Sequence, residues 1–201
     1  MQKQMTKIGL YFGSFNPVHI GHMAIAGYLS EFTDLDQVWF VVSPHNPLKK
    51  KETLLDDTER LKMVELALGG SFNIRPCDVE FRMPVPSYTI DTMVYLEEKY
   101  PTYRFCLIMG EDNLSTLHKW KNIEVISQRY QIYVYPRNRA GKDIPGESMD
   151  IVRNSDIKMV NAPLMDISGS FVRQGIKEGK DMSFFLPPAV WKYIDDKHYY
   201  C

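Results

Sequence analysis

Short apolar segments, rich in β-branched and aromatic side chains, alternate with longer amphipathic patterns along this chain. Residues 38–42 are apolar throughout, which is typical of a parallel strand covered on both faces. Strands are predicted at residues 7–12, 37–42, 72–75, 104–109, 131–135 and 158–160, and helices at residues 20–32, 57–68, 87–99, 169–177 and 188–195. Such alternation predicts right-handed strand–helix–strand crossovers. We therefore expect an α/β fold, doubly wound around a parallel sheet.

The length of the chain and its lack of linkers indicate its domain organisation. At 201 residues it can bury roughly 70% of its unfolded surface in one core. No stretch rich in glycine and serine, no low-complexity segment and no internal repeat divides it. We expect a single domain over residues 1–201, with an exposed loop at residues 137–146 and Ser87 as the N-cap of the third helix.

Charge and composition exclude several functional classes. The 24 Lys and Arg residues against 25 Asp and Glu residues leave a formal net charge of −1, without the basic excess of a nucleic-acid-binding protein. Apolar segments are far shorter than the roughly 20 residues of a membrane-spanning helix. Cys77, Cys106 and Cys201 are too scattered for a disulfide framework. We expect a cytoplasmic protein that binds neither nucleic acid nor membrane.

The end of the first predicted strand carries the strongest functional pattern, Gly-Ser-Phe-Asn-Pro-Val-His-Ile-Gly-His at residues 13–22. Ligands of doubly wound sheets lie beyond the carboxyl ends of the strands. His19 and His22 open the next helix at a spacing that places both imidazoles on one face, beside free backbone N–H groups that favour an anion. This indicates a phosphate site. Zinc binding is disfavoured because no Cys, Asp or Glu stands at ligand spacing, and two ordinary half-exposed histidines are the remaining alternative.

The segment His-Ile-Gly-His at residues 19–22 resembles the signature of the nucleotidyltransferase superfamily, whose Rossmann-like sheet agrees with the expected fold. The same tetrapeptide occurs in class I aminoacyl-tRNA synthetases. In both groups it implies chemistry at the α-phosphorus of a nucleoside triphosphate. Neither a dinucleotide-binding fingerprint nor a P-loop is present in the sequence.

Further segments narrow this resemblance to bacterial nicotinate-nucleotide adenylyltransferases. A basic loop at residues 43–50, Ser-Tyr-Thr-Ile-Asp-Thr at residues 87–92 and Gly-Glu-Asp at residues 110–112, followed by Trp120, are similar to that family's motifs. The segments at residues 167–173 and 185–194 resemble its C-terminal motif and closing helix. These segments occur in the family's order and span nearly the whole chain.

The resemblance implies a role for each matching residue. His19 and His22 would be catalytic, and Tyr88, Thr89, Trp120 and Arg137 would bind nicotinate mononucleotide. ATP would be bound by Gly13, Ser14, Phe15, Lys49, Lys50, Gly110, Asp112, Ser168, Ser170 and Arg173. Helices at residues 168–196 would complete the triphosphate site. Mg²⁺ would be carried by the ATP phosphates without a dedicated protein site, and the oligomeric state is left open.

Several of these residues also have an ordinary structural interpretation. Trp120 could be core packing, Asp112 and Thr89 could be helix caps, and Lys49 and Lys50 could be solvated surface charge. The chain also departs from the family pattern. It has Asn16 where Asp is usual, Lys49 where His is common, Gly-Ser at residues 169–170 for Ser-Thr, and Tyr-Pro-Arg at residues 135–137 for Arg-Pro-Gly. These departures affect substrate preference more than reaction class.

The expected reaction joins ATP and nicotinate mononucleotide to give nicotinate adenine dinucleotide and pyrophosphate in NAD synthesis. Its nucleophile, the 5′-phosphate, is already an anion, so positioning and electrostatic stabilisation suffice without a general base. The enzyme alternatives are a phosphopantetheine adenylyltransferase, a nicotinamide-preferring or dual-specificity enzyme and a synthetase fragment. The alternative outside enzymes is a nucleotide-sensing binding module.

Overall fold

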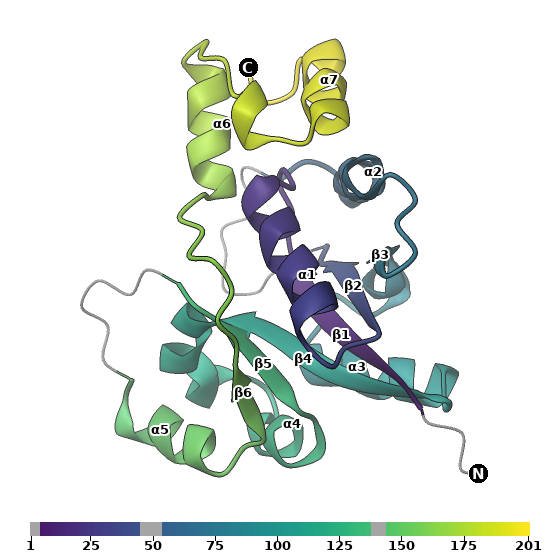
Figure 1. Cartoon of the computed structure of the whole chain (residues 1–201), viewed down its shortest axis with the longest axis vertical. Coiled ribbons are helices and arrows are strands. Elements are labelled where there is room, and N and C mark those ends of the chain that lie inside the picture. The colour runs from purple at the N-terminus through teal and green to yellow at the C-terminus, as the bar shows by residue number, and fades with distance from the viewer. Residues whose placement is uncertain (1–4, 45–53, 138–143) are drawn as a thin grey trace.

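The computed structural model describes residues 5–44, 54–137 and 144–201. Within these residues, six strands form one parallel sheet in the order β3-β2-β1-β4-β5-β6 (Figure 1). The strand order reverses between β1 and β4, which makes the sheet doubly wound and Rossmann-like. The predicted fold class is confirmed. The strands are β1 (Thr6–Gly13), β2 (Gln37–Val42), β3 (Ile74–Cys77), β4 (Tyr103–Gly110), β5 (Ile132–Tyr135) and β6 (Ile157–Met159).

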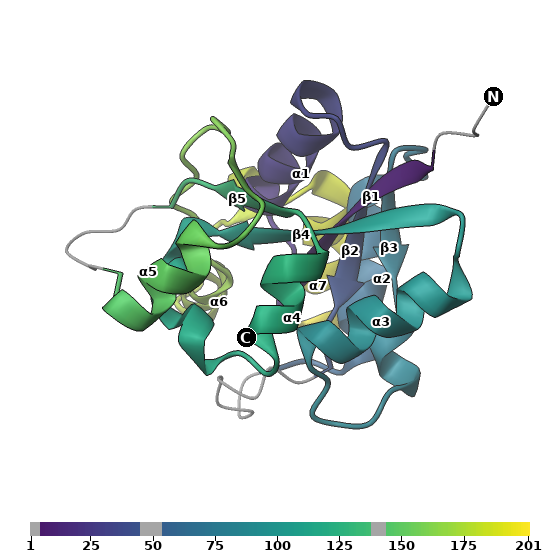
Figure 2. The ribbon, with the colours of Figure 1, turned by 90° about the horizontal axis from the view of Figure 1, so that it is seen from below.

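Helices cover both faces of the sheet, and Figure 2 shows α3 and α4 on the opposite side from α1. One face packs against α1 (Ile20–Phe32) and α2 (Asp57–Leu68), and α6 (Gly169–Lys177) and α7 (Pro188–Lys197) add buried side chains to the same core cluster. The other packs against α3 (Thr89–Lys99), the 3-10 helix η2 (Glu111–Lys119) and α4 (Ile123–Arg129). The central strands β1, β2 and β4 contribute buried side chains to both core clusters, as their continuous apolar sequences predicted. The remaining elements are η1 (Val79–Arg82), α5 (Gly146–Arg153) and η3 (Ser183–Phe185).

The predicted strands and helices are confirmed, with shifts at some of their ends. The third strand begins at Ile74, two residues after its predicted start, because the chain is still turning at Phe72, whose side chain is 76% exposed. Ser87 was wrongly predicted as a helix cap. Helix α3 begins at Thr89, its N-cap is Tyr88, and the Ser87 hydroxyl donates to Glu80 instead. Helices α4, α5, η1 and η3 were not predicted, whereas η2 lies where a short helix was expected beside Asp112.

The C-terminal helices are tied to the rest of the fold through its core. Figure 1 shows an extended segment leading from β6 to α6, with α6 and α7 lying beyond the ends of α1 and α2. Val172 of α6 and Val190 and Ile194 of α7 are almost fully buried in the same cluster as Leu29 of α1 and Met63 of α2. Apolar burial of this kind stabilises each side chain by roughly 1.5–3 kcal/mol. Across the described residues, no helix is long and apolar enough to cross a membrane.

Candidate active site

A cleft of about 700 Å³ opens at the carboxyl ends of β1, β4 and β5, where a doubly wound sheet places its ligand. The structure brings widely separated parts of the chain together there. Lys49 and Lys50 lie outside the described residues. All the other residues that the sequence marked as site residues line this cleft: Gly13, Ser14, Phe15, His19, His22, Tyr88, Thr89, Gly110, Asp112, Trp120, Arg137, Ser168, Ser170 and Arg173.

A sharp turn after β1 shapes one wall of the cleft. Phe15 has a φ of 43°, which is unusual for a bulky residue, and its ring folds back toward the strand end. A Cβ on Gly13 would lie 2.8 Å from this ring, so only glycine fits there. The Phe15 side chain is 2% exposed and packs edge-on against His22, with ring centroids 5.0 Å apart. Phe15 therefore holds the His22 imidazole in place as well as lining the cleft.

His19 and His22 form a stacked pair at the start of α1. Their ring centroids are 3.7 Å apart, with an interplanar angle of 23°, so the predicted placement on one face is confirmed. The backbone N–H of His19 donates to Nδ1 of His22 over 3.2 Å. Because Nδ1 accepts this hydrogen bond, a neutral His22 carries its proton on Nε2. The arrangement gives His22 a fixed orientation and a donor on its other ring nitrogen.

The electrostatic environment of His19 favours its neutral form. Burial, followed by the positive charge of Arg137, lowers the pKa of His19 to about 4. Its side chain is 3% exposed, and Nδ1 has no hydrogen-bond partner among the described residues. The negative charge of a phosphate bound in the cleft would raise the pKa of this imidazole. The pocket around His19 is thus suited to an anion that brings its own charge.

Arg60 organises the strand exits from beneath the cleft. It is 1% exposed, and its guanidinium donates to the backbone carbonyls of Ser14 at 2.7 Å and Ser43 at 2.8 Å. It also donates to the carbonyls of Leu55 and Pro44. These bonds connect the loop after β1 to the loop after β2. The sequence contained a signal for this role, since Arg60 stands on the apolar face of α2, but its partners could not be read from it.

Asn16 joins the first loop to two distant C-terminal segments. Its backbone carbonyl accepts a hydrogen bond from Nη1 of Arg173 at 2.7 Å, and its Oδ1 accepts one from the Tyr200 hydroxyl at 2.6 Å. A Cβ on Gly169 would lie only 2.8 Å from the Asn16 carbonyl oxygen. Asn16 and Gly169, which both depart from the family pattern, are therefore in contact. The lack of a side chain at Gly169 allows α6 to approach the loop that contains Asn16.

The first turn of α6 presents polar groups to the cleft. Ser168 caps the helix by accepting a hydrogen bond from the backbone N–H of Phe171 at 3.2 Å. Arg173 lies one turn later, and its Nη2 donates to the Ser170 hydroxyl at 3.3 Å. A helix N-terminus with a neighbouring guanidinium suits phosphate oxygens. The predicted grouping of Ser168, Ser170 and Arg173 is thus present, although Arg173 also holds the Asn16 loop.

The opposite end of the cleft is aromatic. Nε1 of Trp120 is buried and has no hydrogen-bond partner in the described part of the chain. Lys121 lies with Nζ 4.6 Å from the ring centroid of Tyr88 and 2.8 Å from a carboxylate oxygen of Asp91. Thr89 begins α3, so its backbone N–H lies in the first turn, where no intrahelical acceptor exists. This end combines an aromatic surface with unused donors and one cation.

Arg137 connects the middle of the cleft to the segment that precedes α6. It donates to the backbone carbonyl of Met165 at 3.3 Å, and its Nε lies 4.0 Å from Oδ1 of Asp112. Asp112 does not cap η2, whose N-cap residue is Gly110. Within the described residues, no cluster of three or more His, Cys, Asp or Glu side chains could hold a metal ion.

Comparison with known proteins agrees with this geometry. A protein of Flavobacterium johnsoniae named "probable nicotinate-nucleotide adenylyltransferase" is 55% identical over 194 residues, which cover 96% of this chain and 98% of that protein. A protein of the same name from Cytophaga hutchinsonii is 44% identical over 96% of this chain and 98% of its own length. The cytidylyltransferase-like family model matches residues 10–175. The chain belongs to the nicotinate-nucleotide adenylyltransferases of this family.

A solved structure agrees with this placement at the level of the fold. The nicotinic acid mononucleotide adenylyltransferase of Plasmodium falciparum, complexed with NaAD, superposes with a TM-score of 0.80 over 97% of each chain, at 20% sequence identity. At this identity the likeness speaks for the fold alone. The sequence therefore adopts the doubly wound sheet that its alternating segments predicted.

Sequence reasoning missed several residues of this adenylyltransferase that line the cleft. Lys119 and Lys121 flank Trp120, and that position was the only signal for them. Glu80 reaches the cleft from η1, a short helix that no periodic pattern announced. Tyr200 is not among the lining residues, but its hydroxyl donates to Asn16, 184 residues away in the sequence. Contacts between parts of the chain so far apart leave no trace in local spacing.

Proposed function

We propose that this chain transfers the adenylyl group of ATP to nicotinate mononucleotide, producing nicotinate adenine dinucleotide and pyrophosphate for NAD synthesis. The observation that carries this proposal is the stacked pair of His19 and His22 at the start of α1, inside a cleft with an aromatic end. The names of the relatives support nicotinate mononucleotide over phosphopantetheine as the acceptor. Their near-complete coverage of this chain argues against a synthetase fragment.

The reaction needs no general base at this site. An oxygen of the mononucleotide 5′-phosphate attacks the α-phosphorus of ATP, and the bond between that phosphorus and the bridging oxygen breaks to release pyrophosphate. Negative charge grows on the transferring group and on the leaving pyrophosphate. Nε2–H of His22 is oriented by the Nδ1 hydrogen bond and would donate to these oxygens. A neutral donor of fixed orientation stabilises the developing charge without transferring its proton.

The α6 end would bind the triphosphate. Ser168, Ser170 and Arg173 offer hydroxyl and guanidinium donors there, and Gly13, Ser14, Phe15, Gly110 and Asp112 would contact the rest of ATP. We include Lys49 and Lys50 in this proposal on sequence alone. Because no protein metal cluster is present among the described residues, Mg²⁺ would bind through phosphate oxygens and water, shielding phosphate charge.

The aromatic end would bind the pyridine ring. Trp120 and Tyr88 offer ring faces, and the backbone N–H groups at Tyr88 and Thr89 would donate to the nicotinate carboxylate. Arg137 would contact the mononucleotide between the two ends. We further propose that residues 1–201 act as one catalytic domain in the cytoplasm, where ATP and pyridine nucleotides meet.

Pyrophosphate release tests this proposal directly. The purified protein is mixed with ATP, Mg²⁺ and one acceptor at a time: nicotinate mononucleotide, nicotinamide mononucleotide or phosphopantetheine. We expect the highest kcat/KM with nicotinate mononucleotide, together with a product whose mass is that of nicotinate adenine dinucleotide. Release only with phosphopantetheine would replace the proposed acceptor. ATP binding without turnover for any acceptor would favour a nucleotide-sensing module.

A further inference from the structure

Glu80 is a buried carboxylate at the aromatic end of the cleft. It belongs to η1, its side chain is 2% exposed, and it lines the cleft. Its two oxygens have different partners. The Ser87 hydroxyl donates to Oε2 at 2.9 Å, and the Thr92 hydroxyl donates to Oε1 at 2.7 Å. A buried carboxylate requires such donors, because leaving it unpaired is strongly unfavourable.

The two donors of Glu80 flank the start of α3. Ser87 immediately precedes Tyr88 and Thr89, and Thr92 lies in the first turn after them. The N-cap residue Tyr88 makes no side-chain capping hydrogen bond. The start of α3 has no side-chain cap of its own, and the carboxylate of Glu80 holds it in place through Ser87 and Thr92. It also closes the loop from η1 to α3, since its hydrogen bonds span 7 and 12 residues of sequence.

We propose that Glu80 is a positioning residue for nicotinate recognition. Through Ser87 and Thr92 it sets the backbone of Tyr88 and Thr89, so that their N–H groups meet the pyridine carboxylate. This inference rests on the proposed function. Direct contact between Glu80 and the nicotinate carboxylate is disfavoured, because both groups are negative and each Glu80 oxygen already accepts a hydroxyl. Glu80 thus acts on the substrate through the helix start.

A positioning role predicts a selective defect. If Glu80 only stabilised the fold, its variants would lower the amount of active protein and leave both Michaelis constants unchanged. If it aims the N–H groups, its variants raise KM for nicotinate mononucleotide and reduce discrimination against nicotinamide mononucleotide. The KM for ATP should stay the same, because the triphosphate is assigned to α6 at the other end of the cleft.

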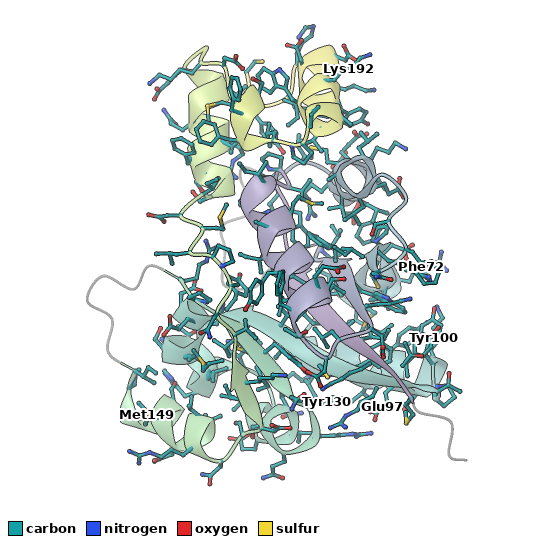
Figure 3. The ribbon with its side chains drawn as sticks, viewed as in Figure 1. Phe72, Glu97, Tyr100, Tyr130, Met149 and Lys192 are labelled. Carbon is teal, nitrogen blue, oxygen red and sulfur yellow. The ribbon has the colours of Figure 1, made fainter. Side chains whose placement is uncertain are left out.

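The experiment compares Glu80→Gln and Ser87→Ala with two matched controls. Glu97→Gln changes a carboxylate that also accepts a tyrosine hydroxyl, from Tyr130 at 2.9 Å, and Figure 3 shows both side chains at the end of the molecule opposite α7. Ser127→Ala removes a buried hydroxyl that donates to the Glu124 carbonyl at 2.9 Å. Neither control residue lines the cleft.

Steady-state pyrophosphate release is measured for both mononucleotides, with circular dichroism and thermal unfolding as folding checks. We expect Glu80→Gln and Ser87→Ala each to raise KM for nicotinate mononucleotide about five- to twentyfold, as the loss of aligned donors predicts. We expect KM for ATP to change less than about twofold. In both variants the preference for nicotinate over nicotinamide should fall. The two substitutions together should have less than their summed effect, because both alter the contact between residues 80 and 87.

Two outcomes would overturn the inference. One is a folded Glu80→Gln protein with KM for nicotinate mononucleotide and substrate discrimination close to those of the unchanged chain. The other is a defect in Glu80→Gln that Ser87→Ala does not share, which would indicate direct contact with substrate. If the unchanged chain itself transfers no adenylyl group, the proposed function fails instead. The test uses Glu80→Gln because Gln keeps the shape of Glu. It therefore does not depend on whether Glu80→Ala, which would leave a cavity, can fold.

Discussion

The hydroxyl of Tyr200 donates to Oδ1 of Asn16 over 2.6 Å, which joins the C-terminal segment after α7 to the loop that precedes the stacked pair of His19 and His22. The same asparagine accepts the guanidinium of Arg173 on its backbone carbonyl. Two separate C-terminal segments therefore hold one loop, and that loop leads directly into His19 and α1. The C-terminal segments are thus part of the site's geometry as well as of its core.

Tyr200→Phe tests this connection by removing one oxygen atom. Oδ1 of Asn16 would lose the Tyr200 hydroxyl and keep its contact with the Leu55 N–H at 3.4 Å. We expect the free energy of unfolding to fall by about 1–2 kcal/mol and KM for ATP to rise, as measured by urea denaturation and pyrophosphate release. The control is Tyr193→Phe, which removes a hydroxyl that donates to Glu59 at 2.7 Å, outside the loop. Equal KM changes in both variants would contradict a specific role for Tyr200.

Arg173→Ala separates the two ends of the cleft. Charge-assisted hydrogen bonds contribute about 1.5–3 kcal/mol each, so calorimetry should show ATP affinity reduced at least about tenfold. Affinity for nicotinate mononucleotide should stay within about threefold, because we assign that ligand to the aromatic end. Lys177→Ala removes another cation of α6, in its last turn, and serves as the control. A parallel loss of both affinities would point to collapse of α6.

The sequence predicted the sheet better than it predicted the site's internal contacts. The apolar segment at residues 37–42 can be read as a strand because burial on both faces leaves a continuous apolar pattern. Helix α4 is only seven residues long and too short for a clear helical period. Candidate site residues in motifs near strand ends lie together in one cleft, because parallel strands end at the same edge of the sheet. Glu80 and Tyr200 could not be found, because their importance depends on partners that only the folded chain brings near.

The depressed pKa of His19 predicts a contribution to acid unfolding. Its ordinary pKa is about 6.5, and burial and Arg137 lower the folded value to about 4. Below about pH 6.5 the unfolded chain binds a proton that folded His19 resists, so stability is lost as the pH falls toward 4. The loss approaches roughly 2–3 kcal/mol at pH 4. Urea unfolding between pH 7 and 4 should therefore show a shallower decline in His19→Asn.

The control for that measurement is His198→Asn. His198 is an exposed histidine after α7, and its backbone is in the left-handed conformation, which asparagine also tolerates. Its pH dependence should match that of the unchanged chain. If His19→Asn also declines as steeply as the unchanged chain, the proton taken up on unfolding belongs to another group.

His22→Ala tests the proposed donor. Because Nε2–H would stabilise charge that grows only in the transition state, its loss should reduce kcat at least about 100-fold. The KM values should change little by comparison. His22→Gln offers an amide N–H near the position of Nε2 and should recover part of the rate. Near-normal turnover in folded His22→Ala, measured by pyrophosphate release, would remove the histidine from the mechanism.

The preference between nicotinate and nicotinamide mononucleotides should depend on which groups at the aromatic end are left to bind the substituent on the pyridine ring. Nicotinate and nicotinamide mononucleotides differ only by a carboxylate against an amide. Asp91 is paired with Lys121, and both oxygens of Glu80 already accept hydroxyls. The carboxylates near the ring are therefore occupied, while the N–H groups at the start of α3 remain to meet an anion. The Lys121 ammonium has three N–H donors, so it can contact a substrate carboxylate while it stays paired with Asp91. The amide of nicotinamide would turn its own N–H₂ group toward some of these protein donors and leave them without an acceptor.

Each unpaired buried group costs about 1–3 kcal/mol, so we expect kcat/KM for nicotinate mononucleotide to exceed that for nicotinamide mononucleotide about ten- to several-hundredfold. Lys121→Met should reduce this ratio, because it removes a charge that only the carboxylate can use. Trp120→Ala should weaken both substrates alike, because the two rings stack equally well. A ratio near one in the unchanged chain would contradict a pocket of donors, and a ratio unaffected by Lys121→Met would assign the preference to the backbone N–H groups alone.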